Sequence, residues 1–186
     1  MQSMQQERIE IRLTGSGGQG LITAGIILAE AAGVYENKQA TQSQSYGPEA
    51  RGGASKSEVI ISSQEIDYPK VIQPDILLAM TQEATSKYLS DLKPNGIAII
   101  DSTFVRDNLS RDRIYLIPIS KIAKEKTGKM ITANIVALGA LVAITKIVSR
   151  KTIEQAVLAR VPKGTEKLNL AALQAGFTAG EEVLNQ

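Results

Sequence analysis

The residues with the clearest chemical potential form the glycine-rich stretch TGSGGQG. Gly15, Gly17 and Gly20 match the G-x-G-x-x-G spacing of a dinucleotide site, and Gly18 and Gln19 complete the stretch. Between a strand and a helix, such glycines allow positive φ angles and let a ligand approach backbone N–H groups. The N-terminus of the following helix also favours an anion. The stretch therefore predicts a loop that can bind a phosphate or another anionic group.

Two further signatures of nucleotide sites are missing around this stretch. A dinucleotide site usually also has an acidic residue about 20 positions further on, yet no Asp or Glu lies between Glu36 and Glu49. A P-loop ends in Gly-Lys-Ser/Thr, whereas Gly20 is followed by Leu21 and Ile22. Three interpretations remain open: a bound NAD or FAD, another anionic group, or a tight turn needed only for packing.

A second polar cluster, SYGPEARGG, follows about 25 residues later in the chain. Tyr46 offers an aromatic face and a hydroxyl, Arg51 a fork for carboxylate or phosphate, and Glu49 an acceptor. If the second strand runs parallel to the first, its carboxyl end lies beside the glycine loop and the two loops converge. The other interpretation is an exposed turn in which Glu49 and Arg51 pair locally. Loops of this composition are also typical of protein interfaces.

Composition excludes several kinds of site. The 186 residues include no Cys and no His, so the chain cannot form disulfides, ligate iron–sulfur clusters or use the commonest general base. With 21 Lys and Arg against 19 Asp and Glu and few aromatic residues, nucleic acid is a poor candidate partner. The length fits a single domain over residues 1–186.

The sequence also predicts a protein of the cytoplasm without a membrane span. The N-terminal stretch MQSMQQERIE has no apolar segment, which argues against a secretory signal. The most apolar run, residues 131–148, contains Thr, Asn and Lys, and these residues favour a buried helix over a span.

The pattern of apolar residues predicts alternating strands and helices. Strands are expected at residues 9–14, 38–44, 55–62, 74–81, 97–102 and 113–120. In the third of these, Val59 and Ile61 share one face and Ile60 the other, and SQEIDYP after it reads as a short hairpin return. Helices are expected at residues 21–32, ended by Gly33, and at 82–92, 119–126, 131–148, 152–160 and 165–184. The pattern predicts an α/β fold, a Rossmann-like three-layer domain with a mainly parallel sheet and a helical C-terminal third.

Several other polar residues have an ordinary structural interpretation beside a functional one. Asp101, at the carboxyl end of a predicted strand, is expected to act in a turn or cap. Asn134, in the apolar run, needs a hydrogen-bond partner if it is buried. Four lysines could attract a phosphate or an acidic partner, but a solvated helix end is the ordinary interpretation. They are Lys121, Lys124, Lys126 and Lys129.

Several stretches in a fixed order resemble a known family. They are GSGGQGLITAGIILAEAA, QSQSYGPEARGGASKSEVIIS with IDYP shortly after, PDILLAMTQEA and LKPNGIAIIDS. Together they resemble the gamma subunit, or gamma domain, of the 2-oxoacid:ferredoxin oxidoreductases, and the resemblance runs from about Ile9 to Ala179. QSQSYGPEARGG looks most like the gamma subunits of the 2-oxoglutarate and branched-chain 2-oxoacid enzymes. The resemblance therefore favours 2-oxoglutarate as substrate, followed by a branched-chain 2-oxoacid.

The resemblance implies an enzyme of several subunits, in which this chain is inactive alone. Such an enzyme decarboxylates a 2-oxoacid on thiamine diphosphate, passes electrons through iron–sulfur clusters to ferredoxin and releases an acyl-coenzyme A. The alpha and beta subunits, or a cluster-bearing delta subunit, are implied to hold thiamine diphosphate, Mg and the clusters. This chain is implied to hold none of these cofactors by itself, although contact with coenzyme A is plausible.

With this resemblance, the expected site has no catalytic residue and no metal ligand. Contacts with coenzyme A are expected from Gly15, Gly17, Gly18, Gln19, Gly20, Tyr46 and Arg51. Contacts with the thiamine-bearing subunits are expected from Gly47, Pro48, Glu49, Gly52 and Gly53. Two alternatives stay open: a stand-alone nucleotide- or anion-binding module, and an interaction scaffold whose loops only make subunit contacts.

Overall fold

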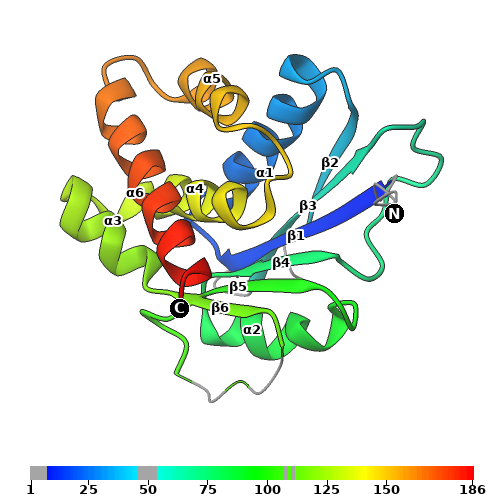
Figure 1. Cartoon of the computed structure of the whole chain (residues 1–186), viewed down its shortest axis with the longest axis horizontal. Helices are drawn as coiled ribbons and strands as arrows, with labels where there is room; N and C mark the ends of the chain where they lie inside the picture. The colour runs from blue at the N-terminus through cyan, green and yellow to red at the C-terminus, as the bar shows by residue number, and fades with distance from the viewer. Residues whose placement is uncertain (1–7, 46–53, 107–108, 110–111) are drawn as a thin grey trace.

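A six-stranded sheet forms the centre of the computed structural model, which describes residues 8–45, 54–106, 109 and 112–186 (Figure 1). The strands are β1 Arg8–Ser16, β2 Gln39–Ser45, β3 Ala54–Ser62, β4 Ile76–Ala79, β5 Ile97–Asp101 and β6 Ile114–Ile117. The α-helices are α1 Leu21–Glu30, α2 Gln82–Tyr88, α3 Ile119–Thr127, α4 Ala133–Thr145, α5 Arg150–Arg160 and α6 Glu166–Leu184. A π-helix, Ala31–Tyr35, and two 3-10 turns, Leu89–Asp91 and Met130–Thr132, complete them. The α/β fold with its helical C-terminal third is confirmed.

The sheet is mainly parallel, as predicted, but β3 interrupts it. The strand order is β2-β3-β1-β4-β5-β6, and β1, β4, β5 and β6 pair in parallel. β3 pairs antiparallel with both β1 and β2, so β2 runs in the direction of β1 without touching it. We call the side of the sheet where β1 and the strands parallel to it end the carboxyl edge, and the opposite side the amino edge.

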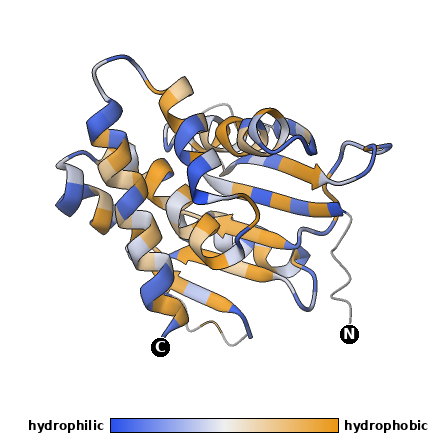
Figure 2. Ribbon diagram, turned by 45° about the horizontal axis from the view of Figure 1, so that its top comes forward, coloured by the Kyte–Doolittle hydropathy of each residue, from blue (hydrophilic) through white to orange (hydrophobic). Residues whose placement is uncertain are grey.

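Helices cover both faces of the sheet and make the three layers expected from the sequence (Figure 1). Alternate strand residues such as Ile11, Leu78 and Ile99 pack against the layer that contains α1, α3, α4, α5 and α6. Leu77 and Ile100 point to the other face and pack with residues of α2. Figure 2 shows mostly hydrophobic residues along the central strands and hydrophilic residues on the outer loops. The core therefore lies on both sides of the central strands, as expected for a parallel sheet.

The predicted C-terminal ends of two helices were wrong because local backbone geometry continues or ends the helix elsewhere. The helix after the glycine loop does not end at Gly33 but continues through the π-helix to Tyr35, and Asn37 then takes a positive φ of 58°. The apolar run 131–148 is not one helix, because α4 ends at Thr145 and Lys146 has a left-handed φ of 53°.

The segment SQEIDYP does not form the expected hairpin return. Residues 63–75, between β3 and β4, contain no strand. Side chains of β1 hold this connection instead: Arg8 donates hydrogen bonds to the carbonyls of Tyr68, at 2.8 Å, and Lys70, at 3.2 Å. The chain thus crosses the amino edge as an ordered loop.

α4 is buried against α6, as the sequence interpretation of its apolar run requires. Its residues from Ala133 to Ala143 are buried. The two helices meet at Gly139 and Gly176, where a Cβ on Gly176 would lie 2.9 Å from the Cα of Gly139. Among the residues that the structure describes, no helix has both the length and the apolar character needed to cross a bilayer.

Candidate functional site at the carboxyl edge

The glycine loop lies at the carboxyl edge between β1 and α1, where the sequence predicts it. Gly18 and Gly20 have φ angles of +85° and +75°, which strain any residue with a side chain. At Gly15 a Cβ would lie 2.6 Å from Cδ1 of Leu21 and would also meet Oε1 of Gln19. Because that oxygen accepts a hydrogen bond from the Ser16 N–H at 2.8 Å, Gln19 holds the loop closed.

The N-terminus of α1 is exposed at this loop. No side chain of the described residues caps the helix, and its first turn contains no acidic residue. A Cβ at Gly17 or Gly18 would meet nothing within 4 Å, so the outer side of the loop is open. Since the first amides of a helix carry partial positive charge, this arrangement can attract an anion.

Asn134 of α4 supports the loop from the helical layer. Its Nδ2 donates to the Gly20 carbonyl at 3.2 Å, and the same carbonyl accepts from the Ala24 N–H at 3.0 Å. A Cβ at Gly20 would lie 2.6 Å from Nδ2 of Asn134. The partner that the sequence analysis required for a buried Asn134 is therefore the glycine loop.

The second predicted loop joins β2 to β3 and lies outside the described residues. It includes Tyr46, Gly47, Pro48, Glu49, Arg51, Gly52 and Gly53. The residues on each side of it are placed: Ser45 ends β2, and Ala54 of β3 pairs with Ser16 of β1. Ser55 also donates its hydroxyl to the Gly15 carbonyl, at 3.4 Å. The two ends of the second loop therefore lie at the edge that carries the first loop.

Asp101 also lies at the carboxyl edge and acts as a cap, as predicted. Its buried carboxylate accepts hydrogen bonds from the backbone N–H of Ser120, at 3.2 Å, and from the Ser120 hydroxyl, at 2.6 Å. It also accepts from the Thr103 N–H at 3.0 Å. Asp101 thus fixes the start of α3 against the end of β5.

Two of the four lysines around α3, Lys121 and Lys124, make ordinary surface contacts. Lys124 donates from Nζ to the Gly128 carbonyl, at 3.2 Å, just past the end of α3. Lys121 lies 3.8 Å from Glu125 one turn along the helix, and both side chains are exposed. These two contacts stabilise a helix and its end.

Three exposed apolar side chains lie in the segments after β5 and before α4, and the sequence analysis missed them. Phe104 follows β5, while Met130 and Ile131 precede α4. The sequence placed Ile131 inside a buried helix, yet 64% of its surface is exposed because α4 begins only at Ala133. The 3-10 turn Met130–Thr132 occupies the predicted start of the helix, and Gly128 ends α3 before it with a φ of +72°.

A charged cluster elsewhere on the sheet joins separate elements of the fold by ion pairs. Arg12, only 4% exposed, donates from Nε to Oε1 of Glu58 at 2.8 Å and from Nη1 to Asp91 at 2.6 Å. In the described part of the chain, no group of three or more Cys, His, Asp or Glu residues is placed to hold a metal ion.

Glu36, after the π-helix, ties two distant segments together. Its carboxylate accepts from Lys38, from the Ser149 N–H at 2.6 Å and from the Thr152 hydroxyl at 2.8 Å, at the start of α5. Burial alone would raise the pKa of Glu36, but these hydrogen bonds together outweigh burial, so its pKa lies below the ordinary value of 4.5. Glu36 is therefore a stabilising anion at neutral pH.

The described part of the carboxyl edge thus carries an anion-attracting loop, and exposed apolar side chains lie in the segments after β5 and before α4. The loop supplies backbone amides and a helix N-terminus. Phe104, Met130 and Ile131 supply surface of the kind that is buried in protein contacts. The chemistry available here is binding and contact.

Comparison with known proteins agrees with this geometry. A family model described as pyruvate ferredoxin/flavodoxin oxidoreductase matches residues 10–179. The 2-oxoglutarate synthase subunit KorC of Methanocaldococcus jannaschii is 51% identical, and the match covers 95% of this chain and 96% of that protein. The same subunit of Methanothermobacter marburgensis is 49% identical, over 91% of this chain and 95% of its own length.

A solved structure also matches over almost the full chain. It is the gamma subunit of a keto/oxoacid ferredoxin oxidoreductase from Geobacter sulfurreducens, with a TM-score of 0.88, 51% identity and coverage of 95% of this chain and 98% of that one. The family match spans most of the chain, and the relatives align with it from end to end. The chain therefore belongs to the pyruvate ferredoxin/flavodoxin oxidoreductase family, in which it corresponds to gamma subunits.

Proposed function

We propose that this chain is the gamma subunit of a 2-oxoglutarate:ferredoxin oxidoreductase. The observation that carries the proposal is the difference in similarity between relatives. The KorC subunit of 2-oxoglutarate synthase is 51% identical over 95% of this chain. The ketoisovalerate oxidoreductase subunit VorA of Methanothermobacter thermautotrophicus is 35% identical over 73% of this chain, which corresponds to 28% of that protein.

The redox cofactors would then lie on partner subunits. A chain without Cys or His lacks the usual ligands of an iron–sulfur cluster. The described residues also contain no group of three or more Cys, His, Asp or Glu placed to hold a metal ion. The expected partners are alpha and beta subunits that hold thiamine diphosphate, and a subunit that passes electrons to ferredoxin.

The carboxyl edge would contribute contacts to coenzyme A. The exposed N-terminus of α1 and the open side of Gly17 and Gly18 suit one of its phosphate groups. A related 2-oxoglutarate:ferredoxin oxidoreductase from Magnetococcus marinus, 25% identical with a TM-score of 0.82, was solved with 2-oxoglutarate, coenzyme A and succinyl-CoA bound. This chain corresponds to 32% of the length of that one.

A dinucleotide is the weaker candidate for the same loop. β3 runs antiparallel beside β1, where a dinucleotide fold has a parallel strand. The strand that does run parallel, β2, ends in Ser45 without an acidic residue for the ribose. Calorimetry of the purified chain against NAD, FAD and coenzyme A should therefore detect binding of coenzyme A alone, and binding of NAD or FAD would favour the dinucleotide.

The substrate is tested on the assembled enzyme. This chain is co-expressed with its alpha, beta and cluster-bearing partners, and reduction of ferredoxin is followed with 2-oxoglutarate, 3-methyl-2-oxobutanoate or pyruvate in the presence of coenzyme A. We expect kcat/KM for 2-oxoglutarate to exceed the values for the other two substrates by about tenfold or more. A difference of this size is expected when the substrate pocket recognises one additional group of the preferred substrate. Equal or higher kcat/KM for the branched substrate would overturn this assignment.

The coenzyme A contact is tested with two variants of one residue. Gly17 can carry a side chain without a clash, so Gly17→Asp places a negative charge before α1, and Gly17→Asn is its neutral control. The carboxylate should repel a phosphate and raise the KM for coenzyme A by about tenfold or more, with the KM for the 2-oxoacid unchanged. The Asn variant should stay close to the wild type. Equal coenzyme A kinetics in both variants would instead favour a loop that makes only subunit contacts.

A further inference from the structure

The amino edge carries a second surface, on the opposite side of the sheet from the glycine loop. A concavity of about 660 Å³ opens there beside the first residues of β1, β4 and β5. Its apolar lining includes Ile9, Ile76, Ile97 and Ile147, and its polar lining includes Asp75, Lys93 and Arg113. The lining therefore combines isoleucine side chains with charged groups, and we call these charged residues the rim.

The charges at this rim leave one cation without a carboxylate. Asp75 lies 2.9 Å from Nζ of Lys93, and it also accepts the Glu10 N–H at 2.8 Å. Arg113 donates one hydrogen bond, to the Asn95 carbonyl at 2.8 Å, and it takes part in none of the ion pairs among the described residues. The rim thus carries a net positive charge at Arg113.

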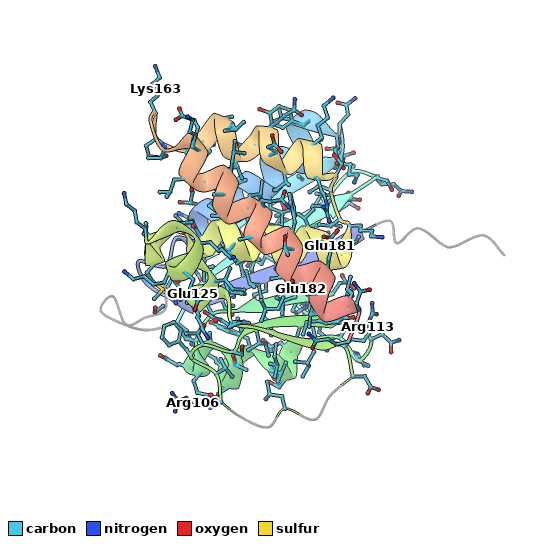
Figure 3. The ribbon with its side chains drawn as sticks, turned by 60° about the vertical axis from the view of Figure 1, so that its left-hand side comes forward. Arg106, Arg113, Glu125, Lys163, Glu181 and Glu182 are labelled. Carbon is cyan, nitrogen blue, oxygen red and sulfur yellow. The ribbon has the colours of Figure 1, made fainter. Side chains whose placement is uncertain are left out.

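Arg113 has an unusual backbone conformation. Its φ of 62° is left-handed, a conformation that costs a residue with a side chain about 1–2 kcal/mol. Figure 3 shows Arg113 on one side of the molecule and Arg106, which follows β5 at the carboxyl edge, on the other. The two edges therefore present separate surfaces to any partner.

The loop that borders the concavity presents two large apolar side chains to solvent. Tyr68 is 51% exposed and Ile72 is 67% exposed. Their backbone is fixed, because Arg8 holds the Tyr68 carbonyl and Glu10 accepts the Ile72 N–H at 3.2 Å. Gln73, the next residue after Ile72, lines the concavity. A fixed loop loses little conformational entropy when it binds, which favours its use in a protein contact.

We propose that this amino-edge surface, formed by Tyr68, Ile72, Lys93, Asn95 and Arg113, binds a partner subunit of the same enzyme. The inference rests on the proposed function, which supplies the partner. The partner segment that would fit this surface carries a large apolar side chain and, next to it, an Asp or Glu. The apolar side chain would enter the isoleucine-lined concavity, and the carboxylate would pair with Arg113. Exposed Tyr and Arg are the residue types that most often anchor such contacts.

The chemistry of the surface favours a protein segment over a free anion. A single uncompensated guanidinium matches one carboxylate. The exposed apolar area on Tyr68 and Ile72 lies outside the polar rim, where only a larger partner could cover it together with the concavity. The assembled enzyme would thus hold this chain at both edges of its sheet.

The test measures assembly with two variants that should leave the fold intact. Ile72→Ser removes exposed apolar surface, and Arg113→Asn removes the charge with a residue that tolerates the left-handed backbone. Each variant is mixed with immobilised alpha and beta subunits, and its dissociation constant is measured. We expect each change to weaken binding about tenfold or more. The salt dependence of binding should also become weaker in Arg113→Asn, since a charge pair is lost.

Matched controls carry the same changes elsewhere. Leu158→Ser alters an exposed leucine of α5, and Lys163→Asn alters a lysine that projects away from the body of the molecule (Figure 3). Both should bind like the wild type, and circular dichroism checks that all four variants are folded. If Ile72→Ser and Arg113→Asn bind like the wild type, the amino-edge surface is not the contact, while the proposed function stands. If the wild-type chain itself does not bind, the proposed function fails and the inference falls with it.

Discussion

Replacing Gly176 by Ala tests how closely α4 and α6 must pack. A Cβ at this position would lie 2.9 Å from Cα of Gly139 and closer still to the carbonyl oxygen of Val136, whereas ordinary contact starts at 3.4 Å. Both obstacles are backbone atoms, so the two helices would have to move apart. We expect this overpacking to cost about 3 kcal/mol. Because Ala is the better helix former by about 1 kcal/mol, the expected net loss of stability is about 2 kcal/mol.

The assay is unfolding of the purified chain by heat and, separately, by urea, each followed by far-UV circular dichroism. A loss of this size should lower the Tm by about 4–8 °C for a chain of this length. Gly17→Ala is the control, because a Cβ there meets nothing within 4 Å, and its stability should stay within about 0.5 kcal/mol of the wild type. If Gly176→Ala were neutral, or more stable by the helix-propensity gain, the reasoning from backbone contact would be refuted.

Three further predictions concern the glycine loop and the two charged clusters. Gly20→Ala should destabilise the chain by about 2 kcal/mol or more, because it combines a left-handed backbone with a Cβ 2.6 Å from Nδ2 of Asn134; a urea midpoint equal to that of Gly17→Ala would contradict this. Arg12→Met should cost about 3 kcal/mol, because Glu58 stays buried and keeps only Lys56 as an ion-pair partner, at 3.1 Å. Adding Glu58→Leu should recover most of that loss, and a double variant as unstable as the single one would argue against the charge-burial explanation. Glu36→Gln should destabilise the chain at pH 7. Since the folded-state pKa of Glu36 is lowered, the contribution of its charge is present above the unfolded value of about 4.5 and is lost as the pH falls through the folded value. The stability difference between the wild type and Glu36→Gln should therefore shrink with acidification, and a constant difference down to pH 3 would show that Glu36 acts only by packing.

The sequence predicted the type of most elements because each carries a local pattern. Val59 and Ile61 alternate with Ile60, and in the structure Val59 and Ile61 indeed pack together against the helical layer. The glycine loop was placed correctly between a strand and a helix, since its spacing and its apolar flanks are local features. The family resemblance rested on several such stretches in order, and the family match over residues 10–179 confirms it.

Boundaries were less predictable where a single backbone angle decides them. Lys146 ends α4 in a left-handed conformation that a lysine adopts only when its surroundings require it. The π-helix after α1 likewise carries the chain past Gly33, a residue that often ends a helix. In both cases packing outweighed the local preference of the residue.

The sequence by itself determined which segments become strands and helices, which loop can attract an anion, and that no thiolate or imidazole chemistry is available to this chain. Only the tertiary structure decided that β3 lies antiparallel between β1 and β2, and that Asn134 holds Gly20 across 114 positions of sequence. It also decided that Tyr68 and Ile72 stay exposed beside the concavity at the amino edge. The physical reason is that periodicity and turn chemistry act over a few neighbouring residues. Strand order, the burial of a particular amide and the exposure of a particular side chain depend instead on which segments, distant in the sequence, lie next to one another in the fold.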